Sequence, residues 1–389
     1  MIYLDNGATT RKKPNTVIAA LLDGATKFSA NPGRSGHKAS LDCALEVANA
    51  RQVIQEYFGI SRMENVIFTS GCTESLNLAI LGSVKKGGHV IATTFEHNST
   101  LRPLFELEKN GVIELSIVEP TEKGKIKLED IKKYVRPNTY MICTIHVSNV
   151  DGAETDITEI GNFCKENGYI YLVDAAQSAG HKCINMQKQN INFLTLAGHK
   201  GLFGVQGVGA LLIEGDHLPN PIKFGGTGTE SISVYQPHEP PECYESGTIA
   251  TPNILSLKAG VEFVKKYEKE IQEKMQKQTK WLLDELNKIE NVKTYTDFNN
   301  LNGVISFNIG DIDSTEVAEY LSENYGICVR GGLHCAPLKH KFLGTLNQGT
   351  VRVSLSYFTT NNELKMFIIA IKKYVELIKQ SNQKMHNYY

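Results

Sequence analysis

The sequence predicts an α/β protein built on a largely parallel sheet. From about residue 65 to residue 215, short apolar segments alternate with stretches of helical pattern. The apolar segments are nearly continuous, which is typical of strands buried on both faces of a parallel sheet. Ligands of such sheets bind at the carboxyl ends of the strands. The residues that follow each apolar segment are therefore the first candidates for a functional site.

Seven segments are expected to be strands of this sheet: residues 65–69, 89–94, 112–118, 140–148, 169–174, 192–198 and 207–213. Helices are expected after Thr73, near Asn98 and between most of the later strands. Residues 215–252 then change in character, because they contain GGTG and six of the twelve prolines. We expect a long ordered loop there, and long loops in compact chains are usually functional.

The remainder of the chain predicts a second, smaller α/β region. A charge-rich helical pattern runs from about residue 254 to 289, and a terminal helix begins at about Asn361. Strands are expected near residues 303–308, 326–330 and 350–355. We therefore predict a large domain over residues 16–252 and a discontinuous small domain over residues 1–15 plus 253–389.

Composition narrows the class of protein. Lys and Arg total 41 against 42 for Asp and Glu, which argues against nucleic-acid binding as the main role. No window of the sequence approaches about 18 consecutive apolar residues, so we expect no membrane span. The first ten residues, MIYLDNGATT, show no basic start followed by a long apolar stretch, so we expect no secretory signal. The eight cysteines include no C-x-x-C pair and are expected to be reduced thiols of a cytoplasmic protein.

Lys200 lies between a predicted strand and a glycine-rich turn, in GHKGLFGVQGVG. Apolar surroundings favour the neutral amine of a lysine, which can form a Schiff base with a carbonyl. The glycines behind it fit neither the phosphate-binding loop nor the dinucleotide fingerprint. The alternative is a surface lysine beside a turn.

Asp174 ends a strongly apolar predicted strand, YIYLVD, 26 residues before Lys200. A buried carboxylate is costly unless a positive group pairs with it. A protonated pyridine nitrogen is such a group, and pyridoxal phosphate sites use an acidic partner for it. The alternative is a cap of the next helix.

Other strand ends carry groups suited to a planar, phosphorylated cofactor. The turn SGCTES places Cys72 and Thr73 at a predicted helix start, where free N–H groups attract phosphate. His97, in EHNS, could stack on a ring and move protons near neutral pH. Asn149 and Gln177 are neutral hydrogen-bonding groups that could contact a phenolic oxygen. Each also has a structural interpretation, as a helix cap or a solvated side chain.

Cys335 lies in a loop bounded by glycine and proline, RGGLHCAPL. Such a loop can expose a thiol and move it, and the neighbouring His334 could favour the reactive thiolate. No complete set of metal ligands accompanies these residues, so no metal site is predicted. Arg352 lies on a predicted strand and could bind a substrate carboxylate in two places, or form a structural salt bridge.

Taken together, these motifs resemble the cysteine desulfurases of the class V aminotransferase superfamily. The resemblance spans roughly residues 2–375, through DNGATT, NPGRSGH, SGCTES, EHNS, VSNV, VDAAQS, GHKGLFGVQGVG, ESGT and RGGLHCAP. The short catalytic loop resembles the second group of that family. The resemblance implies fold type I of pyridoxal phosphate enzymes, with a mainly parallel seven-stranded sheet in the large domain and a smaller α/β C-terminal domain.

The resemblance also implies roles for residues of this chain. Lys200 would hold the cofactor aldehyde, with Asp174 at the ring nitrogen and His97 on the ring face. Further expected contacts are Gln177 at the ring hydroxyl, Asn149 near the substrate or ring oxygen, Cys72, Thr73 and His199 at the phosphate, and Thr248 reaching over from the partner subunit of a homodimer. Ala197 stands where the family commonly has serine, which removes one expected phosphate contact.

The implied reaction converts L-cysteine to L-alanine, with Arg352 holding the substrate carboxylate and Cys335 receiving the sulfur as a persulfide. A partner protein would then accept the sulfur, as in iron–sulfur cluster assembly. Three alternatives stay open: a selenocysteine lyase or other C–S lyase, a class V aminotransferase, and a non-enzymatic scaffold for cluster assembly. The first two do not need Cys335 as sulfur acceptor, and the third predicts a colourless protein that is indifferent to Lys200→Ala.

Overall fold

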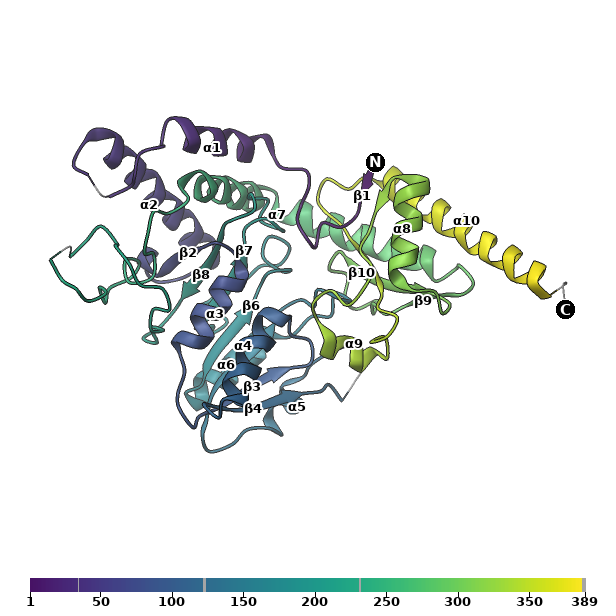
Figure 1. The fold of residues 1–389 in the computed structure, drawn as a ribbon, viewed down its shortest axis with the longest axis horizontal. Helices are drawn as coiled ribbons and strands as arrows, with labels where there is room; N and C mark the ends of the chain where they lie inside the picture. The colour runs from purple at the N-terminus through teal and green to yellow at the C-terminus, as the bar shows by residue number, and fades with distance from the viewer. Residues whose placement is uncertain (34, 122–123, 231, 387–389) are drawn as a thin grey trace. The chain divides into compact units, whose positions relative to one another are not determined.

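The computed structural model describes residues 1–33, 35–121, 124–230 and 232–386, and it divides into two compact units (Figure 1). The large unit comprises Lys12–Val147 and Glu154–Glu268, and the small unit comprises Met1–Arg11, Ser148–Ala153 and Lys269–Tyr389. Each unit combines helices with a sheet, so the predicted α/β class is confirmed.

The large unit is built on a seven-stranded sheet with the order β2-β8-β7-β6-β5-β3-β4. All pairings are parallel except those of β8, which runs antiparallel to both β7 and β2. The strands are β2 (Val66–Thr69), β3 (His89–Thr93), β4 (Glu114–Val118), β5 (Thr139–Ile145), β6 (Ile170–Asp174), β7 (Phe193–Ala197) and β8 (Gly209–Ile213). Each corresponds to one of the seven predicted segments, and all but the edge strand β4 are almost entirely buried, as expected for continuous apolar segments of this length.

Helices cover this sheet and connect its strands. They are α1 (Asn15–Thr26), α2 (Lys38–Phe58), α3 (Cys72–Gly82), α4 (Asn98–Lys109), α5 (Leu128–Lys132) and α6 (Ile157–Asn167), with a short 3-10 helix at Met63–Asn65. The starts of α3 and α4 agree with the predicted positions. The sequence pattern did not predict α1 and α2, which precede the alternating segments.

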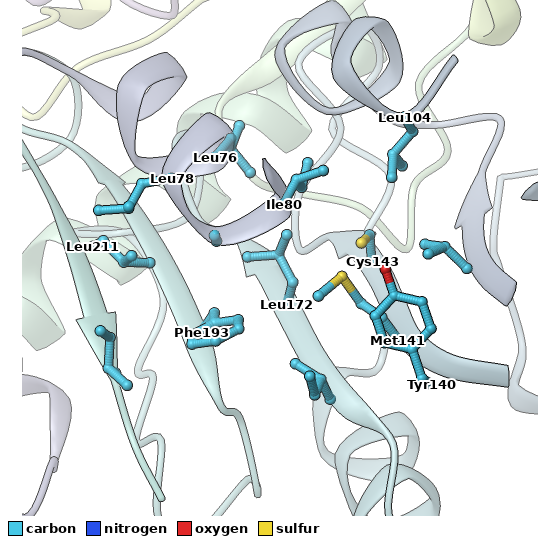
Figure 2. Close-up of a cluster of buried hydrophobic side chains, with 14 of the residues drawn as sticks. Leu76, Leu78, Ile80, Leu104, Tyr140, Met141, Cys143, Leu172, Phe193 and Leu211 are labelled. Carbon is cyan, nitrogen blue, oxygen red and sulfur yellow. The ribbon is translucent and has the colours of Figure 1, made fainter. Parts of the chain in front are cut away.

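The core of the large unit lies between the sheet and the helices α3 and α4. Figure 2 shows Leu76, Leu78 and Ile80 of α3 above side chains of the strands, among them Leu172 and Phe193. All are buried, and burial of apolar area is worth about 25 cal/mol per Å². This packing fixes the start of α3 against the carboxyl ends of β6 and β7.

The small unit contains two short sheets. In one, β1 (Ile2–Tyr3) pairs in parallel with β11 (Ile327–Cys328), and in the other β10 (Val304–Ile309) pairs antiparallel with β9 (Val292–Thr294) and β12 (Val351–Ser354). The three predicted strands correspond to β10, β11 and β12. The two strands that were not predicted, β1 and β9, are only two and three residues long.

Helices complete the small unit: α8 (Ser314–Tyr325), α9 (Pro337–Leu343) and α10 (Asn361–His386). The long helix α7 (Thr251–Leu286) belongs to both units and is interrupted at Tyr267, which has non-helical backbone angles. Within the residues that the structure describes, no helix is long and apolar enough to cross a membrane.

Candidate active site

The carboxyl ends of β6 and β7 bring Asp174 and Thr195 together as paired residues of adjacent strands. Asp174 is only 3% exposed, and its Oδ1 accepts a hydrogen bond from the backbone N–H of Ala176 at 2.8 Å. The thiol of Cys72, at the start of α3, lies 3.6 Å from the same oxygen and 3.3 Å from Thr195 Oγ1. Three elements therefore converge on one buried carboxylate.

The Cys72 thiol acts as a neutral donor in this cluster. Burial, and then the adjacent charge of Asp174, raises the pKa of Cys72 well above its ordinary value. The thiol therefore keeps its proton near neutral pH and can donate it to Asp174 or Thr195. The sequence pointed to Cys72 through its place at the helix start, whereas the structure also directs its side chain to Asp174. Thr195 was not predicted, although a polar residue inside the apolar strand FLTLA was a usable signal.

A second set of contacts links the first turns of α3 and α4. Thr73 Oγ1 lies 2.8 Å from Ser99 Oγ, and the backbone N–H of Ser99 donates to His97 Nδ1 at 3.1 Å. His97 is the N-cap of α4, so its Nδ1 is an acceptor and a neutral ring carries its proton on Nε2. Ser99 was not singled out from the sequence. A hydroxyl two residues after the capping histidine in EHNS was the available signal.

Lys200 is half-buried in the turn that follows β7. Its backbone N–H donates to Ala197 O at 3.4 Å, and its carbonyl accepts from Phe203 N at 3.0 Å, so the turn is closed by its own backbone. Phe203 has a φ of 58°, in the left-handed region. The tight turn fixes the backbone from which the Lys200 side chain projects.

His199 and Lys13 lie next to this turn. Lys13 Nζ donates to the carbonyl of His199 at 3.3 Å, and burial lowers the pKa of Lys13 to about 8. Burial, and then the charges of Lys200 and Lys13, lowers the pKa of His199 to about 4, so its imidazole is neutral near pH 7. Lys13 is a cation that the sequence analysis did not identify, because it lies before α1, three residues after the motif DNGATT and away from the strand ends that were searched.

The remaining predicted residues of the large unit differ in exposure. Gln177 is 6% exposed in the turn after β6. Thr248 is exposed in the loop between β8 and α7, which contains no helix or strand within the described residues 214–230 and 232–250. An exposed position leaves Thr248 available to another molecule.

In the small unit, Cys335 has an exposed side chain in the segment before α9. Both His334 and Cys335 have positive φ values, 49° and 58°, which are uncommon for residues other than glycine. The His334 ring packs inward, and its Nε2 lies 3.0 Å from the carbonyl oxygen of Thr350. Since a carbonyl only accepts, Nε2 carries the proton.

Any influence of His334 on the Cys335 thiolate does not come from a positive charge on its ring. Burial, and then the charges of Arg352 and His340, lowers the pKa of His334 well below its ordinary value, so the ring is neutral near pH 7. A neutral ring supplies no positive charge to a neighbouring thiol. Its contacts instead anchor the backbone that carries Cys335.

Arg352 and Asn149 contact each other in the small unit. Arg352, on β12, is 1% exposed, donates to Asn149 O at 3.1 Å and forms a 2.8 Å ion pair with Asp5. Asn149 Nδ2 donates to the carbonyl of His334 at 2.6 Å. Among the described residues, Asn149 Oδ1 and Arg352 Nε are buried without a hydrogen-bond partner. Each of these two atoms therefore has unused capacity to bind a further group.

Comparisons with known proteins agree over almost the whole chain. The model of a family described as aminotransferase class-V matches residues 2–367. A curated probable cysteine desulfurase of Methanothermobacter thermautotrophicus is 31% identical over 373 residues, covering 94% of this chain and 92% of the relative. A probable cysteine desulfurase of Pyrococcus abyssi is 32% identical over 395 residues, covering 98% of this chain and 96% of the relative.

Solved structures also superpose on this chain over almost its whole length. The apo structure of a cysteine desulfurase from Thermococcus onnurineus NA1 superposes with a TM-score of 0.90 at 32% identity, covering 96% of this chain and 94% of that chain. A structure described as a NifS-like protein superposes with a TM-score of 0.85 at 24% identity, covering 97% and 99%, which supports the fold.

Proposed function

This chain belongs to the class V aminotransferase family, and from that membership we propose that it is a pyridoxal-phosphate-dependent cysteine desulfurase. Its substrate is L-cysteine and its products are L-alanine and a persulfide on Cys335. Beyond family membership, one observation carries the proposal: Cys335 is an exposed thiol in a segment with left-handed backbone angles, beside an anchored His334. An aminotransferase or a simple lyase has no use for such a thiol.

The residues of the large unit fit pyridoxal phosphate. Asp174 is a buried carboxylate whose Oδ1 receives its hydrogen bonds from neutral donors, a backbone N–H and the Cys72 thiol. A protonated pyridine nitrogen would supply the positive charge that a buried carboxylate requires. When bound, pyridoxal phosphate stabilises the electron pair left on the substrate carbon and so permits cleavage of the C–S bond.

The phosphate fits the start of α3. The first N–H groups of a helix and its dipole attract an anion, and Thr73 adds a hydroxyl. His199 is neutral and can donate one hydrogen bond without opposing the charge of a phosphate. Gln177 is assigned to the ring hydroxyl, and Thr248 of the partner subunit completes the phosphate contacts.

Lys200 holds the cofactor aldehyde and, once released by the substrate, removes the α-proton from L-cysteine. His97 exchanges a proton with the substrate thiol through Nε2, since Nδ1 already accepts from Ser99. Arg352 binds the substrate carboxylate. Asn149 contributes Oδ1, because its Nδ2 is used by His334.

In the sulfur-transfer step, the thiolate of Cys335 attacks the sulfur of the substrate. The S–S bond of the persulfide forms as the C–S bond breaks, and the electron pair of that bond passes to the β-carbon, which is protonated. The α-carbon regains the proton that Lys200 removed, which gives L-alanine. One cysteine and one thiol thus yield one alanine and one persulfide, with no external oxidant. A thiol reductant or an acceptor protein then removes the sulfur from Cys335.

We also assign a homodimer and a cytoplasmic location. The loop between β8 and α7 exposes several large apolar side chains, including Phe224 at 71%, Val234 at 91% and Tyr235 at 80%. Clustered exposed apolar residues are typical of protein interfaces. A second copy that covers this loop would also bring the partner's Thr248 to the phosphate.

The substitution Cys335→Ala tests this function. We expect the variant to bind pyridoxal phosphate with unchanged visible absorbance but to form alanine from L-cysteine at least about 100-fold more slowly, with dithiothreitol as sulfur acceptor. The matched control is Cys183→Ala, because Cys183 is the other exposed cysteine among the eight, and this variant should keep the wild-type rate.

The products distinguish the alternatives. Alanine made by Cys335→Ala at the wild-type rate would exclude the persulfide route. Pyruvate in place of alanine in the wild-type protein would indicate a C–S lyase. A wild-type protein that stays colourless after incubation with pyridoxal phosphate, with an unchanged spectrum in Lys200→Ala, would exclude the enzyme altogether.

A further inference from the structure

The segment Ser148–Ala153 contacts the chain on both sides of Cys335, and all of these residues belong to the small unit. On the N-terminal side, Asn149 Nδ2 donates to the carbonyl of His334 at 2.6 Å across 185 residues of sequence. On the C-terminal side, Asp151 Oδ2 pairs with Lys339 Nζ at 2.8 Å. Two residues of one short segment thus bracket the thiol.

The Asp151–Lys339 pair is fully buried, with side-chain exposures of 3% and 0%. Removing one partner of a buried pair leaves an uncompensated charge, which strongly favours keeping the two residues together. Lys339 belongs to the first turns of α9, which begins at Pro337, two residues after Cys335. The pair therefore fixes the start of the helix that follows the thiol.

A third connection passes through the ring of His334. Nε2 lies 3.1 Å from Thr350 Oγ1, which in turn donates to Ser306 Oγ at 3.2 Å. Ser306 then donates to the carbonyl of Val150, in the same segment. Every hydroxyl in this chain of hydrogen bonds both accepts and donates, so the side chain of His334 is held as well as its backbone.

These contacts explain how two consecutive residues, neither of them glycine, keep positive φ values. A residue other than glycine is strained in the left-handed conformation, which persists only where its surroundings determine it. We propose that Asp151 and Lys339, together with the Thr350–Ser306 chain, are positioning residues that hold Cys335 in its exposed conformation. The effect of these residues on the rate of alanine formation rests on the proposed function, whereas their restraint of the backbone around Cys335 does not.

The test compares Asp151→Asn with the wild-type protein by two measurements. Amide hydrogen exchange of residues 331–340, followed by mass spectrometry, should become about tenfold faster in the variant, because the start of α9 loses its anchor. The rate of alanine formation should fall at least about tenfold, since a small displacement of a reacting group is costly. The visible absorbance of the bound cofactor, and its change on adding L-cysteine, should stay as in the wild type.

The matched control is Glu245→Gln, which breaks a different buried ion pair, that of Glu245 with Arg51, whose side-chain exposures are 7% and 8%. It should leave exchange of residues 331–340 unchanged. A second variant, Thr350→Val, keeps the shape of a fully buried side chain and removes the hydroxyl that links His334 to Ser306. Thr350→Val should also speed the exchange of residues 331–340 and slow alanine formation. It tests the proposal by itself if Asp151→Asn does not fold.

Unchanged exchange in a folded variant would overturn the restraint. Faster exchange with an unchanged rate of alanine formation would overturn the positioning role, as would an equal effect of Glu245→Gln. Should the wild-type protein form no alanine, the proposed function fails, and the exchange of residues 331–340 alone decides whether this segment holds Cys335.

Discussion

Burial changes the protonation state of Glu96, a residue of the motif EHNS that the sequence alone would treat as an ordinary carboxylate. It is fully buried, and one carboxyl oxygen accepts from Thr93 Oγ1 at 2.7 Å and from the backbone N–H of Ile145 at 2.9 Å. Burial, with a smaller contribution from the charge of Asp174, raises the pKa of Glu96 to about 8. Glu96 is therefore protonated near neutral pH.

This state predicts a pH dependence of stability. Between about pH 5 and pH 8, the folded chain keeps a proton on Glu96 that the unfolded chain, with an ordinary pKa of 4.5, has released. Because the folded state binds more protons, its stability falls as pH rises through this window, by up to about 1.4 kcal/mol per pH unit. Glu96→Gln removes the titration, so the free energy of unfolding of the wild type relative to this variant should decrease from pH 5 to pH 8.

Urea unfolding at several pH values measures this difference. The control is Glu108→Gln on the exposed side of α4, which keeps Glu96 and should therefore still lose stability from pH 5 to pH 8. A difference between wild type and Glu96→Gln that stays constant over the same pH values would mean that Glu96 is ionised in the folded protein.

At the residue scale, the sequence identified candidate side chains of the site but not the residues that these side chains contact. The expected place of Asn149 near a substrate or ring oxygen stays a prediction, and the structure adds that its amide nitrogen donates to the carbonyl of His334. Arg352 does form the salt bridge that was its alternative interpretation, with Asp5. Neither partner is near in sequence, so no local pattern could have indicated it.

At the scale of elements, the turn after Lys200 is set by helix α7. Gly260 of α7 packs against this turn so closely that an added Cβ would lie 1.9 Å from the carbonyl oxygen of Leu202. Such a contact cannot be relieved by rotating a side chain, because the atom belongs to the backbone. The glycine of α7 therefore permits the close approach that the turn requires.

Gly260→Ala should destabilise the protein by about 1–3 kcal/mol, because it overpacks a buried contact. Since the displaced backbone directly follows Lys200, the variant should also retain less pyridoxal phosphate after dialysis. Urea unfolding and visible absorbance measure the two effects. Gly36→Ala is the control, because nothing lies within 4 Å of an added Cβ there, and its effect should stay within about 1 kcal/mol. Equal effects of the two substitutions would contradict the packing explanation.

At the scale of the whole molecule, the assigned residues are divided between the units. Lys200, Asp174 and His97 belong to the large unit, and Cys335 and Arg352 belong to the small unit. The predicted domain boundary after residue 252 stays a prediction, whereas the compact units divide within α7 after Glu268.

The proposed homodimer gives a further prediction. Sedimentation should yield twice the 43.1 kDa of one chain. Val234→Asp places a charge in the exposed apolar loop and should shift the protein toward monomer and lower its cofactor content, since Thr248 of the partner subunit would be lost. Ile369→Asp, at an exposed apolar position of α10, is the control and should stay dimeric. A Val234→Asp variant that remains dimeric with full cofactor would show that this loop is not the interface.

The amino-acid sequence by itself determined the sheet of the large unit and the groups at its strand ends, because both depend on local pattern: continuous apolar segments for buried strands, and polar residues where those segments stop. Only the tertiary structure decided the charge states and the partners. The neutral rings of His199 and His334 and the protonated Glu96 follow from burial, and the contacts of Asn149 and Asp151 with the Cys335 segment join positions far apart in sequence. The burial of these titratable side chains and their long-range contacts are properties of the folded chain, and no local pattern around them encodes either.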